Sequence, residues 1–215
     1  MPYRRKGMKN KKRFNRKRRT GLSIPNSVKS DYNCIQRDVS ELIFANDSTF
    51  EAKLQKTFSL IQIENYTNYT SIWDQYRINM VKVEFIPIMT EIVNKPFDDS
   101  TTVTVTRMPN YCVSIDRDDS APETYDELRA RQYSFIRKAT RPLTLKFKPN
   151  RLMETYSTAT TTGYTVDNSK KFLDCAYAKI PHWGLKVAMQ SASPSACYQI
   201  QIRTTYYMSY AHRRT

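Results

Sequence analysis

Strict alternation of apolar and polar side chains is the feature that most restricts the fold of this chain. In RPLTLKFKP (141–149), apolar residues stand at 143, 145 and 147, with polar residues between them. The same period of two recurs in RINMVKVEFIP (77–87), GLKVAMQ (184–190) and ACYQIQIRTTYYMSY (196–210), and LQKTFSLIQI (54–63) and TTVTVTRM (101–108) are also strand-like. A period of two with one apolar face is typical of antiparallel sheets that pack on one side. The pattern therefore predicts an all-β fold.

The alternation also predicts which side chains point toward the core. One face of each segment should be buried and the other exposed to solvent. We expect an inward position for Val81, Val83, Phe85, Leu143, Leu145, Phe147, Leu185, Val187, Met189, Tyr198, Ile200, Ile202, Thr204, Tyr206 and Met208. We expect an outward position for Lys82, Glu84, Thr144, Lys146, Lys148, Lys186, Ala188, Gln190, Gln199, Gln201, Arg203 and Thr205.

Glycine is scarce, and this restricts how the strands are joined. The chain has four glycines, and neither Asn-Gly nor Asp-Gly occurs, although two-residue hairpin turns favour these pairs. Longer connections are expected, and segments 88–101, 116–139 and 150–171 fit that need. Roughly eight strands joined by long loops favour a single eight-stranded antiparallel jelly roll over a meander barrel.

Two segments favour short helices within this β framework. SAPETYDELRARQ (120–132) places Ser120 and Glu123 at the spacing of a capping box, with Pro122 in the first turn. NYTNYTSIWDQY (65–76) is the second candidate.

Positive charge is concentrated in the first part of the chain. In RRKGMKNKKRFNRKRR (4–19), eleven of sixteen residues are Lys or Arg. Residues 1–30 hold 12 of the 35 basic residues and none of the 20 acidic ones, which leaves 23 basic and 20 acidic residues for 31–215. The first segment therefore carries +12 and the remainder only +3. This asymmetry points to a polyanionic partner, nucleic acid before any other.

The basic segment predicts a disordered arm, because its apolar residues are too few to offset the entropy of ordering it. We divide the chain into residues 1–45, an arm and a linker that becomes ordered near VSELIF (39–44), and residues 46–215, one folded domain. Cations on a flexible arm bind phosphates by releasing counterions, without choosing a sequence. The predicted nucleic-acid-binding residues are Arg4, Arg5, Lys6, Lys9, Lys11, Lys12, Arg13, Phe14, Arg16, Lys17, Arg18 and Arg19.

Two further roles are expected within the arm. Phe14 is predicted to stack on an unpaired base, and a solvated ring is the open alternative. The Lys/Arg run also resembles a nuclear import signal. The residues predicted to form that signal are Lys11, Lys12, Arg13, Arg16, Lys17, Arg18 and Arg19.

Enzymatic motifs are missing from the sequence. GxSxG, HExxH, GxGxxG and GxxxxGK[ST] do not occur, so we expect no catalytic residue and no cofactor. His182, beside Trp183, is expected to pack at the start of a strand. No stretch approaches eighteen apolar residues, so we expect no membrane insertion.

Acidic residues and cysteines leave two metal-site alternatives open. A divalent cation is conceivable at DRDDSAPETYDE (116–127), although a solvated loop or a subunit contact is the favoured interpretation. The acids of that segment are Asp116, Asp118, Asp119, Glu123, Asp126 and Glu127. The cysteines have no CxxC or CxH spacing, which favours isolated, partly buried thiols over a disulfide or a zinc site. They are Cys34, Cys112, Cys175 and Cys197.

Five blocks in a fixed order carry a family resemblance. After the basic segment come YTSIWDQYRINMVKVEFIPIM (69–89), YCVSIDRDDSAPETYDEL (111–128), TRPLTLKFKP (140–149), KIPHWGLKVAM (179–189) and YQIQIRTTYYMSYAHRR (198–214). Together they resemble the capsid proteins of circovirus-like viruses, which have circular single-stranded DNA genomes and encode a replication initiator. The block DQYRINMVKVEFIP (74–87) is the most specific.

The resemblance implies a jelly-roll subunit of an icosahedral T=1 shell. Sixty copies would associate, with pentamers as intermediates, and would package the single-stranded viral DNA. It also implies a location in the virion, passage through the host nucleus with the help of import receptors, and a host cell-surface receptor or glycan of unknown identity.

Two alternatives remain at this point, the second of which belongs to another class of protein. One is the capsid of another small virus, such as an RNA satellite virus. The other is a ribosomal or chromosomal protein with a basic tail. Such proteins usually spread cations over the folded face that touches RNA or DNA, and the near-neutral body argues against this class.

Overall fold

The computed structural model describes residues 31–38, 42–45, 51–88, 108–117, 121–157, 162–167, 171–191 and 198–214. These residues form mostly β-strands, with two short α-helices, α1 (Tyr66–Ile72) and α2 (Tyr125–Ala130), and two 3-10 helices, η1 (Leu60–Gln62) and η2 (Cys175–Tyr177). The strands are β1 (Asp31–Arg37), β2 (Leu42–Ala45), β3 (Ala52–Phe58), β4 (Trp73–Ile88), β5 (Asn110–Ser114), β6 (Ser134–Lys138), β7 (Leu143–Phe147), β8 (Arg151–Ser157), β9 (Thr162–Asp167), β10 (Leu173–Asp174), β11 (His182–Met189) and β12 (Gln199–Arg213). The predicted all-β class is confirmed.

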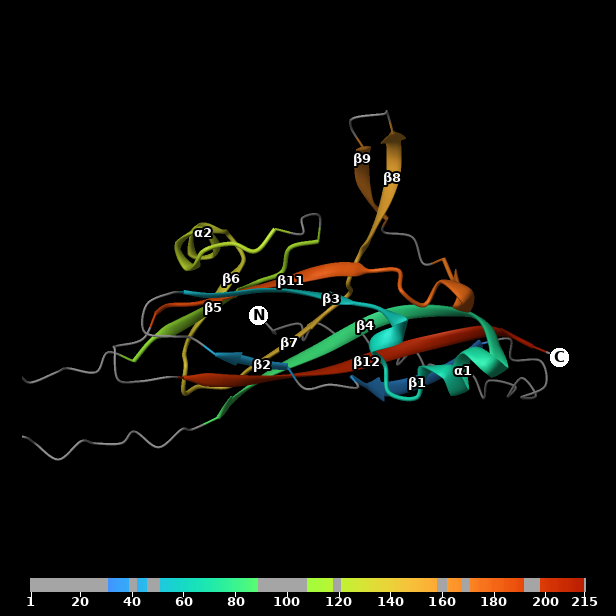
Figure 1. Ribbon diagram of the computed structural model, residues 1–215, viewed down its shortest axis with the longest axis horizontal. Helices are drawn as coiled ribbons and strands as arrows, with labels where there is room; N and C mark the ends of the chain where they lie inside the picture. Colours follow the sequence, from blue (N-terminus) through green and yellow to red (C-terminus); the bar gives the residue numbers. More distant parts are fainter. Residues whose placement is uncertain are drawn as a thin grey trace, which may run out of the picture.

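Two antiparallel sheets lie one above the other (Figure 1). In the first sheet, β12 pairs with both β1 and β2 on one side and with β4 on the other, and β4 also pairs with β7 and β10. The second sheet has the order β3-β11-β5-β6. If β1 and β2 count as two halves of one strand, and the separate β8–β9 hairpin and the two-residue β10 are left aside, eight strands remain. Numbered along the chain, they have the spatial orders 1-8-3-6 and 2-7-4-5. This is the jelly-roll arrangement, so the predicted eight-stranded jelly roll is confirmed.

The core lies between the inner faces of the two sheets. The alternation in β7 predicted its buried face, since Leu143, Leu145 and Phe147 are buried and the residues between them are exposed. Phe58 of β3 meets Phe147 edge to face, with ring centroids 5.6 Å apart. Tyr206 of β12 meets the same Phe58 at 6.2 Å. These aromatic contacts join the sheets, because ring pairs of this geometry add attraction to the burial of their area.

Buried tyrosines on the first sheet keep their hydroxyl groups hydrogen-bonded. Tyr206 donates to Gln62 Oε1 at 3.0 Å, and Tyr210 donates to Gln36 Oε1 at 3.1 Å. Both rings are fully buried. A buried hydroxyl without a partner would be costly, so these bonds allow the strand to hold tyrosine inside the core.

The folded domain begins earlier than the predicted residue 46. Strand β1 pairs with β12 from Asp31 opposite Ala211 to Arg37 opposite Thr205, and β2 continues along the same strand. Residues 31–37 and 42–45 therefore supply the first jelly-roll strand rather than a linker. The prediction missed β1 because two apolar side chains of this edge strand, Tyr32 and Ile35, are exposed, so the burial pattern of a strand is weak.

Two predicted loops contain regular structure. Segment 116–139 carries α2 and β6, and segment 150–171 carries β8 and β9, which form a hairpin that projects away from the sheets (Figure 1). The arm, segment 89–107 with most of TTVTVTRM, and Cys197 lie outside the described residues. The disorder of the arm stays a prediction.

Both predicted helices exist, but α2 starts one turn later than expected. Its N-cap is Thr124, whose Oγ1 accepts a bond from Glu127 N at 3.3 Å, while Glu127 Oε2 accepts from Thr124 N at 2.7 Å. The sequence repeats the capping-box spacing four residues after Ser120, and the second copy forms the cap. Glu123, which the first copy would need, is engaged in ion pairs instead.

Candidate functional site

The outer face of β11 is buried, which corrects the prediction for Lys186 and Ala188. Both side chains are fully buried, and Ala188 forms a small apolar cluster with Cys112, Tyr125 and Leu128. The last two residues belong to α2, which packs across the outer face of β11 and β5. Alternation along one strand could not predict this cover, because α2 comes from a distant segment of the chain.

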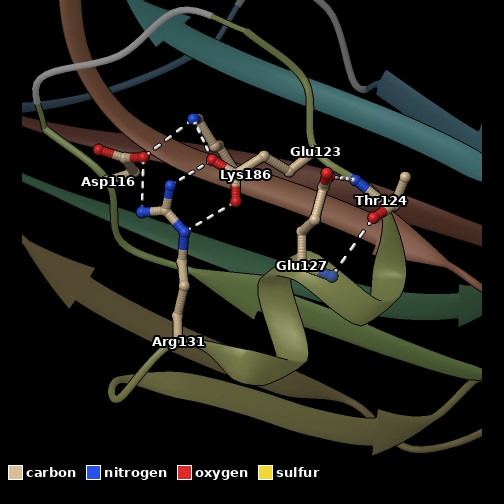
Figure 2. Close-up of polar contacts among 6 residues, drawn as sticks. All are labelled: Asp116, Glu123, Thr124, Glu127, Arg131 and Lys186. Carbon is tan, nitrogen blue, oxygen red and sulfur yellow. Dashed lines mark hydrogen bonds and ion pairs between the residues drawn. The ribbon is translucent and has the colours of Figure 1, made fainter.

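Lys186 is held by two carboxylates beside α2 (Figure 2). Its Nζ lies 2.9 Å from Asp116 Oδ2 and 2.6 Å from Glu123 Oε1. The side chains of Lys186 and Asp116 are only 1% and 2% exposed. A lysine at this depth is stable as a charged group only when it is paired, so the two acids explain its burial.

Arg131 completes the cluster from the far end of α2 (Figure 2). Its Nη1 lies 2.6 Å from Asp116 Oδ2, and its guanidinium also bonds both oxygens of Glu123. Burial acts to lower the pKa of Arg131, but the bonds to Glu123 and the charge of Asp116 raise it above its ordinary value. Two cations therefore balance two acids, and the cluster ties the segment before α2 and the residue after it to β11.

For Asp116 and Glu123 this geometry corrects both the solvated-loop interpretation and the metal-site alternative. Asp116 and Glu123 are neither solvated nor arranged around a vacant metal position, because lysine and arginine occupy their oxygens. Within the described ranges, no group of three or more His, Cys, Asp or Glu side chains is placed to hold a metal ion. Asp118 and Asp119 lie outside those ranges. Asp126 and Glu127 are exposed, as in a solvated loop, and a subunit contact stays a prediction. The sequence signal that could have revealed the cluster was Lys186 itself, a charge in an otherwise apolar strand.

His182 packs at the start of β11, as predicted. It is 4% exposed, and its Nδ1 lies 3.1 Å from the Phe58 carbonyl oxygen and 3.2 Å from that of Ile180. Burial, with a smaller contribution from Arg151, lowers the pKa of His182 to about 4. The ring is therefore neutral near pH 7 and donates from Nδ1, which is a structural role.

The described cysteines are protonated thiols. Cys34, Cys112 and Cys175 are free, and burial raises the pKa of Cys34 and of Cys175 to about 11. Burial also raises the pKa of Cys112. Because the thiolate is the reactive form, these groups are poor nucleophiles and poor metal ligands at neutral pH.

Large apolar side chains are exposed along the edge strands of both sheets. On β1, Tyr32 and Ile35 are 45% and 65% exposed, and β6, at the edge of the second sheet, exposes Phe135 and Ile136 beside Tyr133 at 73%. Edge strands with exposed apolar residues are prone to pair with another chain. These edges are candidate contact surfaces between copies of the chain.

The predicted nucleic-acid-binding and import residues, Arg4 to Arg19, lie outside the described residues, so the structure does not bring them together with any other group. The structure does show where the folded domain begins after the arm. Asp31 begins β1 at the edge of the first sheet, so the arm leaves the domain from this sheet. Across the described ranges, no helix is both long and apolar enough to cross a bilayer.

Comparison with known proteins identifies a matching family and several solved structures with a similar fold. The model of the family described as circovirus capsid protein matches residues 2–214. No curated protein sequence matches. The 60-mer crystal structure of the BFDV capsid protein is 16% identical, covering 86% of this chain and 95% of that one, with a TM-score of 0.64. Its decameric crystal structure is 14% identical, covering 85% and 99%, with a TM-score of 0.55.

A further fold match comes from the capsid of another virus. The crystal structure of cucumber necrosis virus is 15% identical and covers 87% of this chain and 58% of that one, with a TM-score of 0.53. At these identities the solved structures establish a shared fold. The family match rests on nearly the whole chain, the basic segment included.

Proposed function

Because this chain belongs to the circovirus capsid protein family and is a structural protein of the virion rather than an enzyme, we propose that sixty copies assemble into a closed icosahedral shell around single-stranded circular DNA. The observation that carries the proposal is the family match over residues 2–214 of a chain that folds as a jelly roll. The sixty-subunit number is supported by the BFDV capsid protein, whose crystals hold a 60-mer.

Contacts between subunits should come from the folded domain. The exposed apolar edges on β1 and β6 provide surfaces that a neighbouring copy would remove from water. Intermediates such as pentamers fit the closed cyclic symmetry of small oligomers, and the BFDV capsid protein also crystallises as a decamer. Assembly should therefore persist without residues 1–30.

The arm supplies the attraction for the genome. Its +12 on sixty copies gives about 720 positive charges, enough to pair with roughly 700 phosphates. Counterion release makes this attraction independent of sequence, which suits a shell that must accept a whole genome. The same residues would be read by host import receptors before assembly, when the arm is still accessible.

Assembly is tested by sedimentation of the full chain and of a variant that lacks residues 1–30. Sixty copies of the 25.3-kDa chain give about 1.5 MDa, a mass that monomers and small oligomers cannot imitate. Both proteins should form particles, and electron microscopy should show closed shells of one size. Monomers at high concentration for both proteins, also in the presence of single-stranded DNA, would refute the shell.

DNA binding by the arm is tested by salt titration. With 6–10 of the twelve cations engaged, the log–log slope of affinity against salt should lie between roughly −4 and −7. Two unrelated DNA sequences should bind alike, because a disordered arm presents no fixed donors to base edges. Replacing Phe14 by Ala should lower affinity while leaving the slope unchanged, because stacking releases no counterions.

A further inference from the structure

Building on the proposed packaging function, we propose that the folded domain carries a second phosphate-binding surface. This surface is the outer face of the first sheet, and it binds single-stranded nucleic acid alongside the arm. We call it the basic face, and its cations are Arg37, Arg77, Lys82, Lys146, Lys148 and Arg203.

The pairing register places three of these cations in one row. Arg37 of β1 lies opposite Thr205 of β12, and Thr205 lies opposite Lys82 of β4. Lys82 in turn lies opposite Lys146 of β7. Neighbouring strands are about 4.8 Å apart, so the row spans roughly 14 Å across four strands. Opposed residues point to the same side of a sheet, and Arg37 and Lys146 are exposed.

The remaining cations lie in adjacent rows of the same face. Arg203 is opposite Glu84, and Lys148 continues the outward alternation of Lys146 past the end of β7. Arg77 lies opposite Ser209, and its Nε donates to Asn79 Oδ1 at 2.8 Å.

The net positive charge of the folded domain lies on the basic face. Six cations and one carboxylate, Glu84, lie in these rows and sum to +5. Within them Lys82 Nζ is paired with Glu84 Oε1 at 2.6 Å, so Arg37 and Lys146 are the cations of the first row that the test removes. Residues 31–215 carry only +3, so all other positions of the domain sum to −2. The net positive charge of the near-neutral body therefore lies in these rows, and the other positions together are close to neutral. A surface with a net positive charge attracts polyanions.

A tyrosine on the basic face makes single-stranded nucleic acid a better ligand than a sulfated glycan. Tyr207 of β12 lies opposite Met80 on one side and opposite Ile35 on the other, in the row next to Arg37. Its ring is half-buried, and Ile35 is 65% exposed. Unpaired bases stack on such rings while their phosphates meet neighbouring cations, and a glycan chain has no base to stack.

The other side of the domain is built differently. The outer face of the second sheet is covered by α2, and the β8–β9 hairpin projects on that side (Figure 1). A contact of the basic face with itself across a two-fold axis would bring like charges together, because such an interface uses the same patch on both copies. The arm begins directly before β1, an edge strand of the same sheet, so the arm and the basic face are connected parts of one cationic surface.

The test is a salt titration of the full chain with a labelled oligo-dT strand. The variant R37Q/K146Q removes two exposed cations of the basic face. Its matched control, R137Q/K138Q, removes two exposed cations from β6 of the second sheet. The slope for R37Q/K146Q should shrink by about 1.4, at 0.7 per lost phosphate contact, and the control should keep the wild-type slope. Tyr207→Leu should weaken oligo-dT binding about fivefold or more without changing the slope.

Two further measurements separate the possible failures. In the first, heparin replaces oligo-dT, and Tyr207→Leu should then have no effect on binding. A slope for R37Q/K146Q equal to that of the control, or an effect on heparin without one on oligo-dT, overturns the basic face as a nucleic-acid site. A variant with alanine at the seven import residues of the arm tests the proposed function separately. If only this arm variant loses slope, the basic face fails and genome binding by the arm stands; if neither variant loses slope, both fail.

Discussion

Replacing Lys186 with methionine removes the cation at the centre of the buried ionic cluster. The substitution keeps the length of the side chain but leaves Asp116, 2% exposed, with a reduced set of partners. Breaking a buried ion pair by removing one partner costs about 3–5 kcal/mol. Arg131 stays 2.6 Å from Asp116, so we expect the lower end, a loss of about 3 kcal/mol in the free energy of unfolding.

The assay is urea unfolding followed by tryptophan fluorescence, at one protein concentration for all variants because assembly adds to apparent stability. The matched control is Arg214→Ala, which breaks an ion pair to Asp74 whose side chains are 46% and 52% exposed. Exposed pairs contribute about 0–1 kcal/mol, so this variant should unfold almost like the wild type. A double variant, K186M/D116L, should recover part of the loss, since apolar replacements of both partners are often tolerated.

Two results would contradict this reasoning. One is a Lys186→Met variant within about 0.5 kcal/mol of Arg214→Ala, because both pairs would then behave as exposed ones. The other is a double variant that loses as much as the two single variants added together, because this would show no coupling between the two side chains.

Three further predictions concern other parts of the chain. The pKa of His182 falls to about 4 on folding, so the unfolded state takes up the proton first as the pH is lowered. The free energy of unfolding should therefore be at its full value above about pH 6.5 and decline by up to about 3 kcal/mol toward pH 4. His182→Gln should flatten this decline in a series of denaturation curves, and an unchanged decline would assign it to other groups. Gly184→Ala would place a Cβ 2.7 Å from Phe147 Cε2, inside the core, and should cost about 1–3 kcal/mol of unfolding free energy; wild-type stability would mean that the Phe147 ring can move aside. Alanine at the seven import residues should leave the fold unchanged in circular dichroism and keep a fluorescently tagged chain in the cytoplasm of transfected cells, and continued nuclear accumulation would exclude this signal.

The alternation of apolar and polar residues predicted the buried face of each strand that has one side in the core and the other in solvent. The buried faces of β4, β7 and the first part of β12 follow it, because each of these strands has one side in the core. Alternation does not predict the burial of Lys186. Its strand has both faces covered, and the second cover, α2, is supplied by residues about sixty positions earlier in the chain.

The pairing of strands from distant segments could not be predicted from the sequence either. Nothing in DYNCIQR indicates that residues 31–37 add to a strand made of residues 205–211, and its exposed apolar side chains obscure the period of two. The basic face was missed for the same reason. Its cations come from four strands, and only their register shows that Arg37, Lys82 and Lys146 share a row.

The position of β12 has a consequence for how the chain is synthesised. This strand lies between β4 and the β1/β2 pair, yet it follows both in the sequence, so the first sheet cannot close until residues 199–213 have left the ribosome. At 5–20 residues per second, the 125 positions between the end of β4 and the end of β12 take roughly 6–25 s to translate. During this interval the nascent chain exposes two unpaired strand edges, which are sites of aggregation, while its basic arm is already free to meet RNA. Production of soluble subunit should therefore depend on chaperones that act on the nascent chain, more than on the stability of the finished fold.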